Sequence, residues 1–224
     1  MTTTAWFWRC VAGTLGCAVI AIATAQPAKP LYENDFSNAA PGSLPPDFLV
    51  IDGLFAVQQD GTNRFLELPG APLDTFGVLF GPTVKENVTV SARVFGTSKG
   101  RKHPTFGVSL NGSRGYQLRV SPAKRSIELL KDDQVLSSAA FVWESAHWTH
   151  LRLQIRKLAA GSWKIEGKAW PQDGGNSKEP EGWTISAEDK GEPASGRPGI
   201  WGSPFSGEPI RFDDLFVNSI EDVR

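Results

Sequence analysis

The stretch WTHLRLQIRK, residues Trp148–Lys157, alternates apolar and polar side chains along its whole length. Successive side chains of a β-strand point to opposite faces, so this pattern predicts a strand with one apolar face for a core and one polar face. The same alternation recurs in Val88–Phe95 and in Gly115–Val120, and the pattern closes on IRFDDLFV, residues Ile210–Val217. These stretches predict an all-β chain.

Helical periodicity is absent from every window of a dozen residues, and Gly, Pro, Asn and Asp punctuate the short alternating stretches. Asn111-Gly112 and Lys131–Gln134 are turn signals between neighbouring stretches. The number of stretches fits two stacked antiparallel sheets. The predicted strands are Leu31–Phe36, Leu54–Gln58, Arg64–Leu68, Gly77–Phe80, Val88–Phe95, Thr105–Leu110, Gly115–Val120, Ser126–Leu130, Val135–Ala139, Trp148–Lys157, Trp163–Trp170, Trp183–Ala187, Gly199–Trp201 and Ile210–Val217.

The N-terminus has the composition of a secretory signal. Arg9 is the only charged residue among the first 25, and the apolar run Cys10–Ile22 ends in the small-residue site Ala23-Thr24-Ala25. A run of about 13 residues is shorter than the roughly 20 that cross a bilayer as a helix. We expect cleavage after Ala25, a secreted or periplasmic protein, and no transmembrane segment after cleavage. The alternatives are an uncleaved anchor and lipid attachment at Cys17.

Both cysteines, Cys10 and Cys17, lie in that segment, so the mature chain has no disulfide, no cysteine-based zinc site and no thiol nucleophile. Residues 26–30 are expected to form a short tail, residues 31–218 one β-sandwich domain, and residues 219–224 a C-terminal tail. The formal net charge is −1, and the absence of a basic stripe argues against nucleic-acid binding. We expect a monomer.

Three places carry a family resemblance. They are Tyr32–Phe36 followed by Gly42 and Pro45-Pro46, the succession from Gly115 to Trp170, and the closing stretch from Gly199 to Val217. Together they resemble the concanavalin A-like lectin/glucanase superfamily in its laminin-G-like form, of the secreted bacterial type. The resemblance implies a two-sheet antiparallel jelly-roll sandwich with a convex and a concave sheet. Members include lectins, adhesion modules, hydrolases and lyases, so the fold alone does not settle the function.

Polar side chains face away from the predicted core and form one surface if their strands are neighbours. Arginine and glutamine suit sugar hydroxyls and carboxylates. Trp170 and Trp183 flank the loop Pro171–Gly182 and are candidates for an aromatic rim, whereas Trp163 and Trp201 are interpreted as core residues. The alternative is an ordinary solvated sheet face, and a loop packed over it would argue against binding. The predicted ligand-binding residues are Arg93, Gln117, Arg119, His150, Arg152, Gln154, Trp170 and Trp183.

The same resemblance implies a structural calcium ion held by acidic residues of the two terminal regions. Calcium takes six to eight oxygen ligands. If the first and last strands pair, the ligands are Glu33, Asp35 and Asp213, because Asp213 and Asp214 of a regular strand point to opposite faces. The alternative is that Asp35 or Asp213 accepts backbone N–H groups at a strand end.

We expect an exported carbohydrate-recognition module of the lectin kind, with a carbohydrate or glycoconjugate as partner. One alternative is a glycoside-active hydrolase of the 3-keto-glycoside or glucanase kind, which predicts two carboxylates roughly 5–10 Å apart in a cleft, one with a raised pKa. The glucanase signature Glu-x-Asp-x-x-Glu is absent, since Glu33-x-Asp35 is followed by Asn38. The other alternative, a laminin-G-like adhesion module, predicts an exposed apolar patch and no cleft.

Overall fold

The computed structural model describes residue 2 and residues 29–70, 74–172, 178–205 and 207–220. Apart from residue 2, the predicted signal peptide lies outside these ranges, as do Cys17 and the last four residues of the C-terminal tail. Among the described residues, no helix has both the length and the apolar character needed to cross a membrane.

The described chain consists of strands joined by turns, with one short 3₁₀ turn, Pro122–Lys124. The strands are β1 (Tyr32–Asn34), β2 (Leu49–Asp52), β3 (Ala56–Asp60), β4 (Asn63–Leu68), β5 (Phe76–Leu79), β6 (Val88–Phe95), β7 (Thr105–Leu110), β8 (Tyr116–Ser121), β9 (Ser126–Lys131), β10 (Gln134–Ala140), β11 (Trp148–Lys157), β12 (Trp163–Pro171), β13 (Ile185–Asp189), β14 (Gly199–Ser203) and β15 (Ile210–Ser219).

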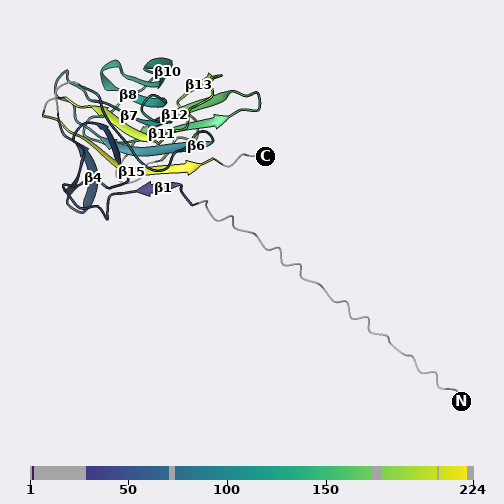
Figure 1. Cartoon of the computed structure of the whole chain (residues 1–224), viewed down its shortest axis with the longest axis horizontal. Coiled ribbons are helices and arrows are strands. Elements are labelled where there is room, and N and C mark those ends of the chain that lie inside the picture. Colours follow the sequence, from purple (N-terminus) through teal and green to yellow (C-terminus); the bar gives the residue numbers. More distant parts are fainter. Residues whose placement is uncertain (1, 3–28, 71–73, 173–177, 206, 221–224) are drawn as a thin grey trace.

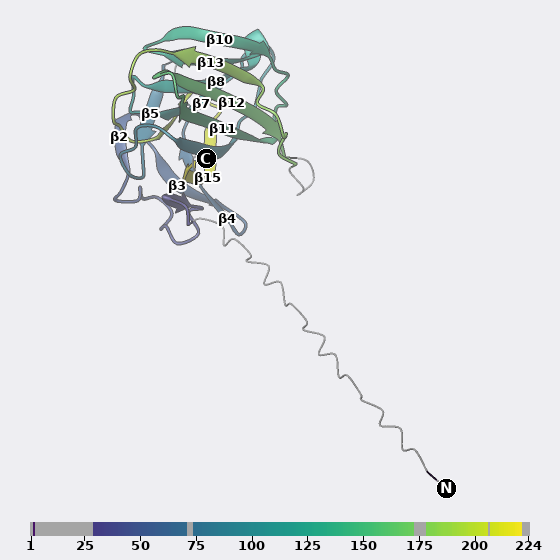
Figure 2. The same ribbon diagram turned by 90° about the vertical axis from the view of Figure 1, so that its right-hand side faces the viewer.

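These strands form two antiparallel sheets that stack face to face (Figures 1 and 2). Sheet A has the order β13-β12-β11-β6-β15-β4-β3, and β1 pairs with β15 beside this path. Sheet B has the order β10-β9-β8-β7-β14-β5-β2. The predicted two-sheet jelly-roll sandwich is confirmed, and every predicted strand overlaps an observed one. Among the observed strands, only β2 was not predicted. Its apolar residues Leu49-Val50-Ile51 show no alternation, and all four residues of the strand are exposed.

The hydrophobic core lies between the two sheets. Val90 of β6, Leu118 of β8 and Leu153 of β11 are each 0% exposed, which confirms the inward faces expected from the alternation. Gly167 of β12 lies against Leu118 across the core, where a Cβ would come within 2.4 Å of a leucine methyl carbon. The glycine therefore permits close packing of the two sheets at this point.

Two turns of sheet B confirm the turn signals read from the sequence. Asp132 and Asp133 join β9 to β10, and their φ angles of 47° and 61° are both left-handed. Two left-handed residues in succession match the twist of antiparallel strands in a two-residue hairpin. Asn111 and Gly112, with φ of 66° and 84°, begin the connection from β7 to β8.

The placement of the core gives a stability prediction from two leucines. Leu118→Ala removes a fully buried side chain, and we expect it to lower the free energy of unfolding by about 2–5 kcal/mol. Leu54→Ala changes a side chain that is 81% exposed, so we expect a change within about 0.5 kcal/mol. Urea denaturation of the two variants measures the difference, and equal losses would contradict this core.

Candidate functional site

The predicted binding residues do not form one surface. Strands β6, β11 and β12 belong to sheet A, whereas β8 belongs to sheet B, and the polar side chains of the two sheets point away from the core in opposite directions. This corrects the expectation of a single polar face, because alternation defines the face of a strand and not the sheet that the strand joins. Arg93, His150, Arg152, Gln154 and Trp170 lie on the outer face of sheet A, and Gln117 and Arg119 lie on the outer face of sheet B.

On the outer face of sheet A, the segment 178–183 packs over β11 and β12. The buried Lys168 donates to the carbonyl of Pro180 at 2.6 Å and pairs with Glu179 at 2.7 Å. Arg152 pairs with the same Glu179 oxygen, also at 2.7 Å. This is the packed loop that argues against a binding face, so the polar groups here stabilise the fold.

The aromatic residues flanking this segment take part in the same packing. Trp170 is buried and stacks on His150, with ring centroids 5.2 Å apart and planes 10° from parallel. Burial lowers the pKa of His150. The ring of Trp183 lies 4.7 Å from the Lys168 ammonium. Gln154 donates to the buried Glu166 at 2.6 Å.

A half-buried arginine joins the middle strands of sheet A. Arg93 donates to Asp213 at 2.6 Å, pairs with Asp214 at 3.0 Å, and lies 4.6 Å from the ring centroid of Trp148. A register shift between Asp213 and Phe216 and the left-handed φ of 48° at Asp214 bring both carboxylates to Arg93. The expectation that the two acids face opposite ways is therefore corrected by a β-bulge. Burial raises the pKa of Asp213 to about 6, although Arg93 opposes this.

The three acids expected to bind calcium do not come together. β1 does pair with β15, with Glu33 opposite Phe216. Asp35, however, accepts the backbone N–H of Ser37 at 3.0 Å and its hydroxyl at 2.7 Å, and Asp213 is held by Arg93. Across the residues that the structure describes, no three His, Cys, Asp or Glu side chains gather as a metal site would require.

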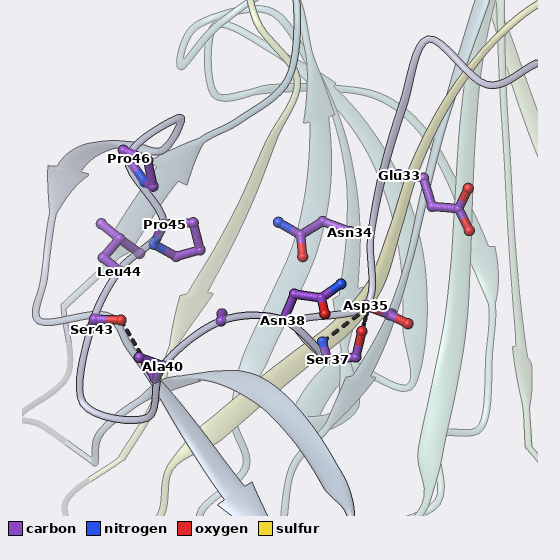
Figure 3. A pocket seen from close by; sticks show the side chains of 11 residues that line it. Glu33, Asn34, Asp35, Ser37, Asn38, Ala40, Ser43, Leu44, Pro45 and Pro46 are labelled. Atoms are coloured by element: carbon purple, nitrogen blue, oxygen red, sulfur yellow. Dashed lines mark hydrogen bonds between the residues drawn. The ribbon is translucent and has the colours of Figure 1, made fainter.

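A hollow of about 650 Å³ adjoins Glu33 and Asp35 and is formed by one stretch of chain, residues 33–46. Figure 3 shows Asp35 turned toward Ser37, with the Ser43 hydroxyl bonded to the Ala40 carbonyl across the loop. These polar groups bond within the loop itself, and within the described part of the chain no side chain outside residues 33–46 lines the hollow.

A second hollow, of about 400 Å³, lies on the outer face of sheet B and is here called the sheet B hollow. It extends from the edge strand β2 across β5, β14, β7 and β8 to the β9–β10 turn. Its lining residues are Ile51, Asp52, Thr75, Phe76, Gly77, Val78, Leu79, Ser109, Ser113, Gln117, Arg119, Asp133, Ile200 and Trp201.

The strand register aligns one row of the sheet B hollow across five strands. The row runs Asp52, Gly77, Trp201, Gly107, Arg119. The indole lies against Gly107, where a Cβ would come within 2.8 Å of the ring. A glycine on each neighbouring strand therefore leaves room for the tryptophan on the face of the sheet.

Trp201 is 8% exposed, but it lies on the outer face and not in the core between the sheets. Its burial agrees with the interpretation of Trp201 as a core residue, but Trp201 does not belong to the cluster between the sheets, whereas Trp163 does. The alternation of side chains along the strand could have predicted the outer position of Trp201, because the adjacent Ile200 faces inward. Among the described residues, the buried Trp201 Nε1 has no hydrogen-bond partner.

Arg119, the last residue of the row, forms an ion pair with Glu128. Its Nε donates to Glu128 Oε2 at 2.7 Å from the neighbouring strand β9, and Glu128 is only 5% exposed. Lys124 and Ser126 also lie 3.3 Å from Glu128 Oε1. Burial opposes ionisation of Glu128, but Arg119 and Lys124 outweigh it and hold its pKa below the ordinary value.

No family model matches the chain, and no curated protein does. Solved structures do match. The carbohydrate binding module CBM66 from Bacillus subtilis has a TM-score of 0.55 at 12% identity, over 77% of this chain and 96% of that one. The exoplasmic/lumenal domain of VIP36 in its Ca²⁺/Man2-bound form has a TM-score of 0.54 at 10% identity, over 87% and 90%.

A third match is a Bacillus subtilis protein of unknown function with a galectin-like fold, with a TM-score of 0.53 at 12% identity, over 86% of this chain and 96% of that one. Identities this low show a shared fold alone. The chain therefore has the jelly-roll sandwich of these lectin-like structures.

The ionised Glu128 gives a pH prediction. Its pKa in the folded state lies below the value of about 4.3 expected in an unfolded chain. The ion pair therefore contributes stability above about pH 4.3, and this contribution is lost as the pH falls through the folded-state pKa. Glu128→Gln removes the titrating group, so parent and variant should differ most near pH 7 and converge below about pH 4.

Urea denaturation of parent and Glu128→Gln from pH 3 to pH 7 measures this convergence. We expect a loss of about 1.5–3 kcal/mol in the variant near pH 7, the range for a hydrogen bond to a charged group. A difference that stays constant over the whole pH range would contradict the assignment.

Proposed function

We propose that this protein is an exported carbohydrate-recognition module that binds sugar in the sheet B hollow. The observation that carries the proposal is the row of Asp52, Trp201 and Arg119, which register aligns across one hollowed sheet face. Export rests on the signal-like N-terminal sequence.

The chemistry of the hollow suits a sugar ring. A volume of about 400 Å³ falls within the roughly 300–1,000 Å³ of small-molecule sites. Trp201 contributes apolar surface to the lining, although only 8% of the residue is exposed. Gln117 offers both a donor and an acceptor, and Asp52 accepts from hydroxyls. The Gln117 amide is oriented by a hydrogen bond to the Ser113 carbonyl at 3.2 Å.

Small residues form the floor of this hollow and let a ligand approach the sheet. Beside the row of Trp201, the next row aligns Gly199, Ser109 and Gln117. Glycine and serine keep the floor low, while the side chains that can bond hydroxyls stand at its sides. On the outer face of sheet A the segment 178–183 packs over β12, and the hollow beside His150, Arg152 and Trp170 measures only about 130 Å³.

The structural neighbours support the same reading by analogy of fold. One is a carbohydrate binding module by name, and the VIP36 domain was solved in a Ca²⁺/Man2-bound form. That domain is exoplasmic or lumenal, which agrees with export of this chain.

Two glutamines on strands of different sheets test the location of the site. Gln117 lines the sheet B hollow, whereas Gln58 is exposed on β3 of sheet A. We expect Gln117→Ala to weaken sugar binding by about tenfold, the equivalent of about 1.4 kcal/mol for a lost hydrogen bond. Gln58→Ala should leave the affinity unchanged.

The measurement starts with the purified chain on an array of oligosaccharides and polysaccharides, with calcium and with a chelator. Isothermal titration of the strongest binder then compares parent, Gln117→Ala and Gln58→Ala. Equal affinities in all three would place the site elsewhere, and a parent that binds no sugar on the array would refute the proposed function.

A further inference from the structure

The charges that line the sheet B hollow are unbalanced. Of its lining residues, all of them within the described ranges, Asp52 and Asp133 carry carboxylates and Arg119 is the only cation. Asp52 belongs to the edge strand β2, and Asp133 to the turn at the far side of the hollow. A ligand in the hollow therefore lies between two carboxylates.

The charge of Arg119, the one cation among the described lining residues, is neutralised by Glu128 of the neighbouring strand. Arg119 and Glu128 are directly paired residues of β8 and β9, with Nε and Nη2 of the guanidinium 2.7 and 2.5 Å from the same carboxylate oxygen. Glu128 does not line the hollow and is buried, so its charge is held against Arg119 and is little screened by solvent. The pair therefore carries no net charge, and two nitrogens of the guanidinium are already engaged, which weakens its attraction for an anionic ligand.

Other cations near the hollow do not change this balance. Lys124 pairs with Glu128 at 3.3 Å, but its side chain is largely exposed and it is not part of the lining. Arg114 lies beside Ser113 and pairs with Asp132 at 3.1 Å. Both pairs are open to solvent on the lysine or arginine side, where salt screens them.

Building on the proposed function, we propose that Asp52, Asp133 and the Arg119–Glu128 pair make the sheet B hollow selective for uncharged sugar residues and exclude sugars that carry a carboxylate or a sulfate. Uncharged sugars donate hydroxyl protons to the two aspartates, and hydrogen bonds to ionised acceptors are the stronger kind. An acidic sugar meets two like charges and, among the described lining residues, no unpaired cation; because both aspartates are exposed, added salt screens this repulsion.

This assigns to Glu128 a role in specificity, although it lines no part of the hollow. Glu128→Gln keeps the size of the side chain and one acceptor for Arg119 but removes the negative charge. The guanidinium then becomes a charged donor available to a carboxylate in the hollow, because arginine matches the planar geometry of that group. Asp52→Asn removes one of the repelling charges without changing the size of the side chain.

The test uses the purified protein and an array in which each neutral oligosaccharide is printed beside its derivative oxidised to the 6-carboxylate. We expect binding to neutral forms, and at least about tenfold weaker binding to their acidic partners. This ratio of affinities, here called the gap, should shrink as salt is added. A parent that binds the acidic forms as well as the neutral ones overturns the selectivity but leaves the proposed function standing. A parent that binds neither form overturns both.

Charge variants identify the cause of the gap. In the double variant Asp52→Asn/Glu128→Gln, we expect the gap to fall below about threefold. The matched control is Glu166→Gln, which neutralises a buried glutamate on the outer face of sheet A that bonds Gln154 and Lys164, and which should leave the gap intact.

Binding of the neutral sugar reports that each variant is folded. If the double variant no longer binds it, Asp52→Asn alone, at an exposed position on the edge strand, is compared with the parent. A gap that does not shrink in a variant that still binds the neutral sugar overturns the inference.

Discussion

The pairing of β15 with β6 is the interaction on which the rest of the sandwich depends. It inserts the last strand of the chain between β6 and β4 in the middle of sheet A, and β1 pairs with the same strand. Phe212, Leu215 and Val217 of β15 enter the core and are fully buried. Sheet A is therefore closed only when the C-terminal strand reaches partners more than 100 residues earlier in the chain, and a domain without disulfides relies on that burial.

The two outer faces of the sandwich differ because their side chains are used differently. On sheet A, the charged groups are matched within the chain, as Arg93 is with Asp213 and Lys168 is with Glu179. On sheet B, glycines flank Trp201 and the face remains hollow. Polar side chains in an alternating strand are thus equally compatible with an internal network and with a binding surface, and the packing around them decides which is formed.

The sequence predicted the strands and their inward faces well because both depend on neighbouring residues alone. Val90, Leu118 and Leu153 face the core as their alternation required. The turn at Asp132 and Asp133 was recognised because short polar residues accept left-handed backbone. The edge strand β2 was missed because an exposed edge imposes no alternation on Leu49-Val50-Ile51.

The candidate site was only partly predictable. The sequence by itself determined an all-β chain with an apolar side to each long strand, and it marked Gln117 and Arg119 as facing away from the core. Tertiary structure decided that β8 and β11 belong to different sheets, that Trp201 lies between two glycines, that Glu128 neutralises Arg119, and that a bulge turns Asp214 toward Arg93. The physical reason is that alternation is a local property of two or three residues, whereas strand order and register are set by which distant strands bury one another.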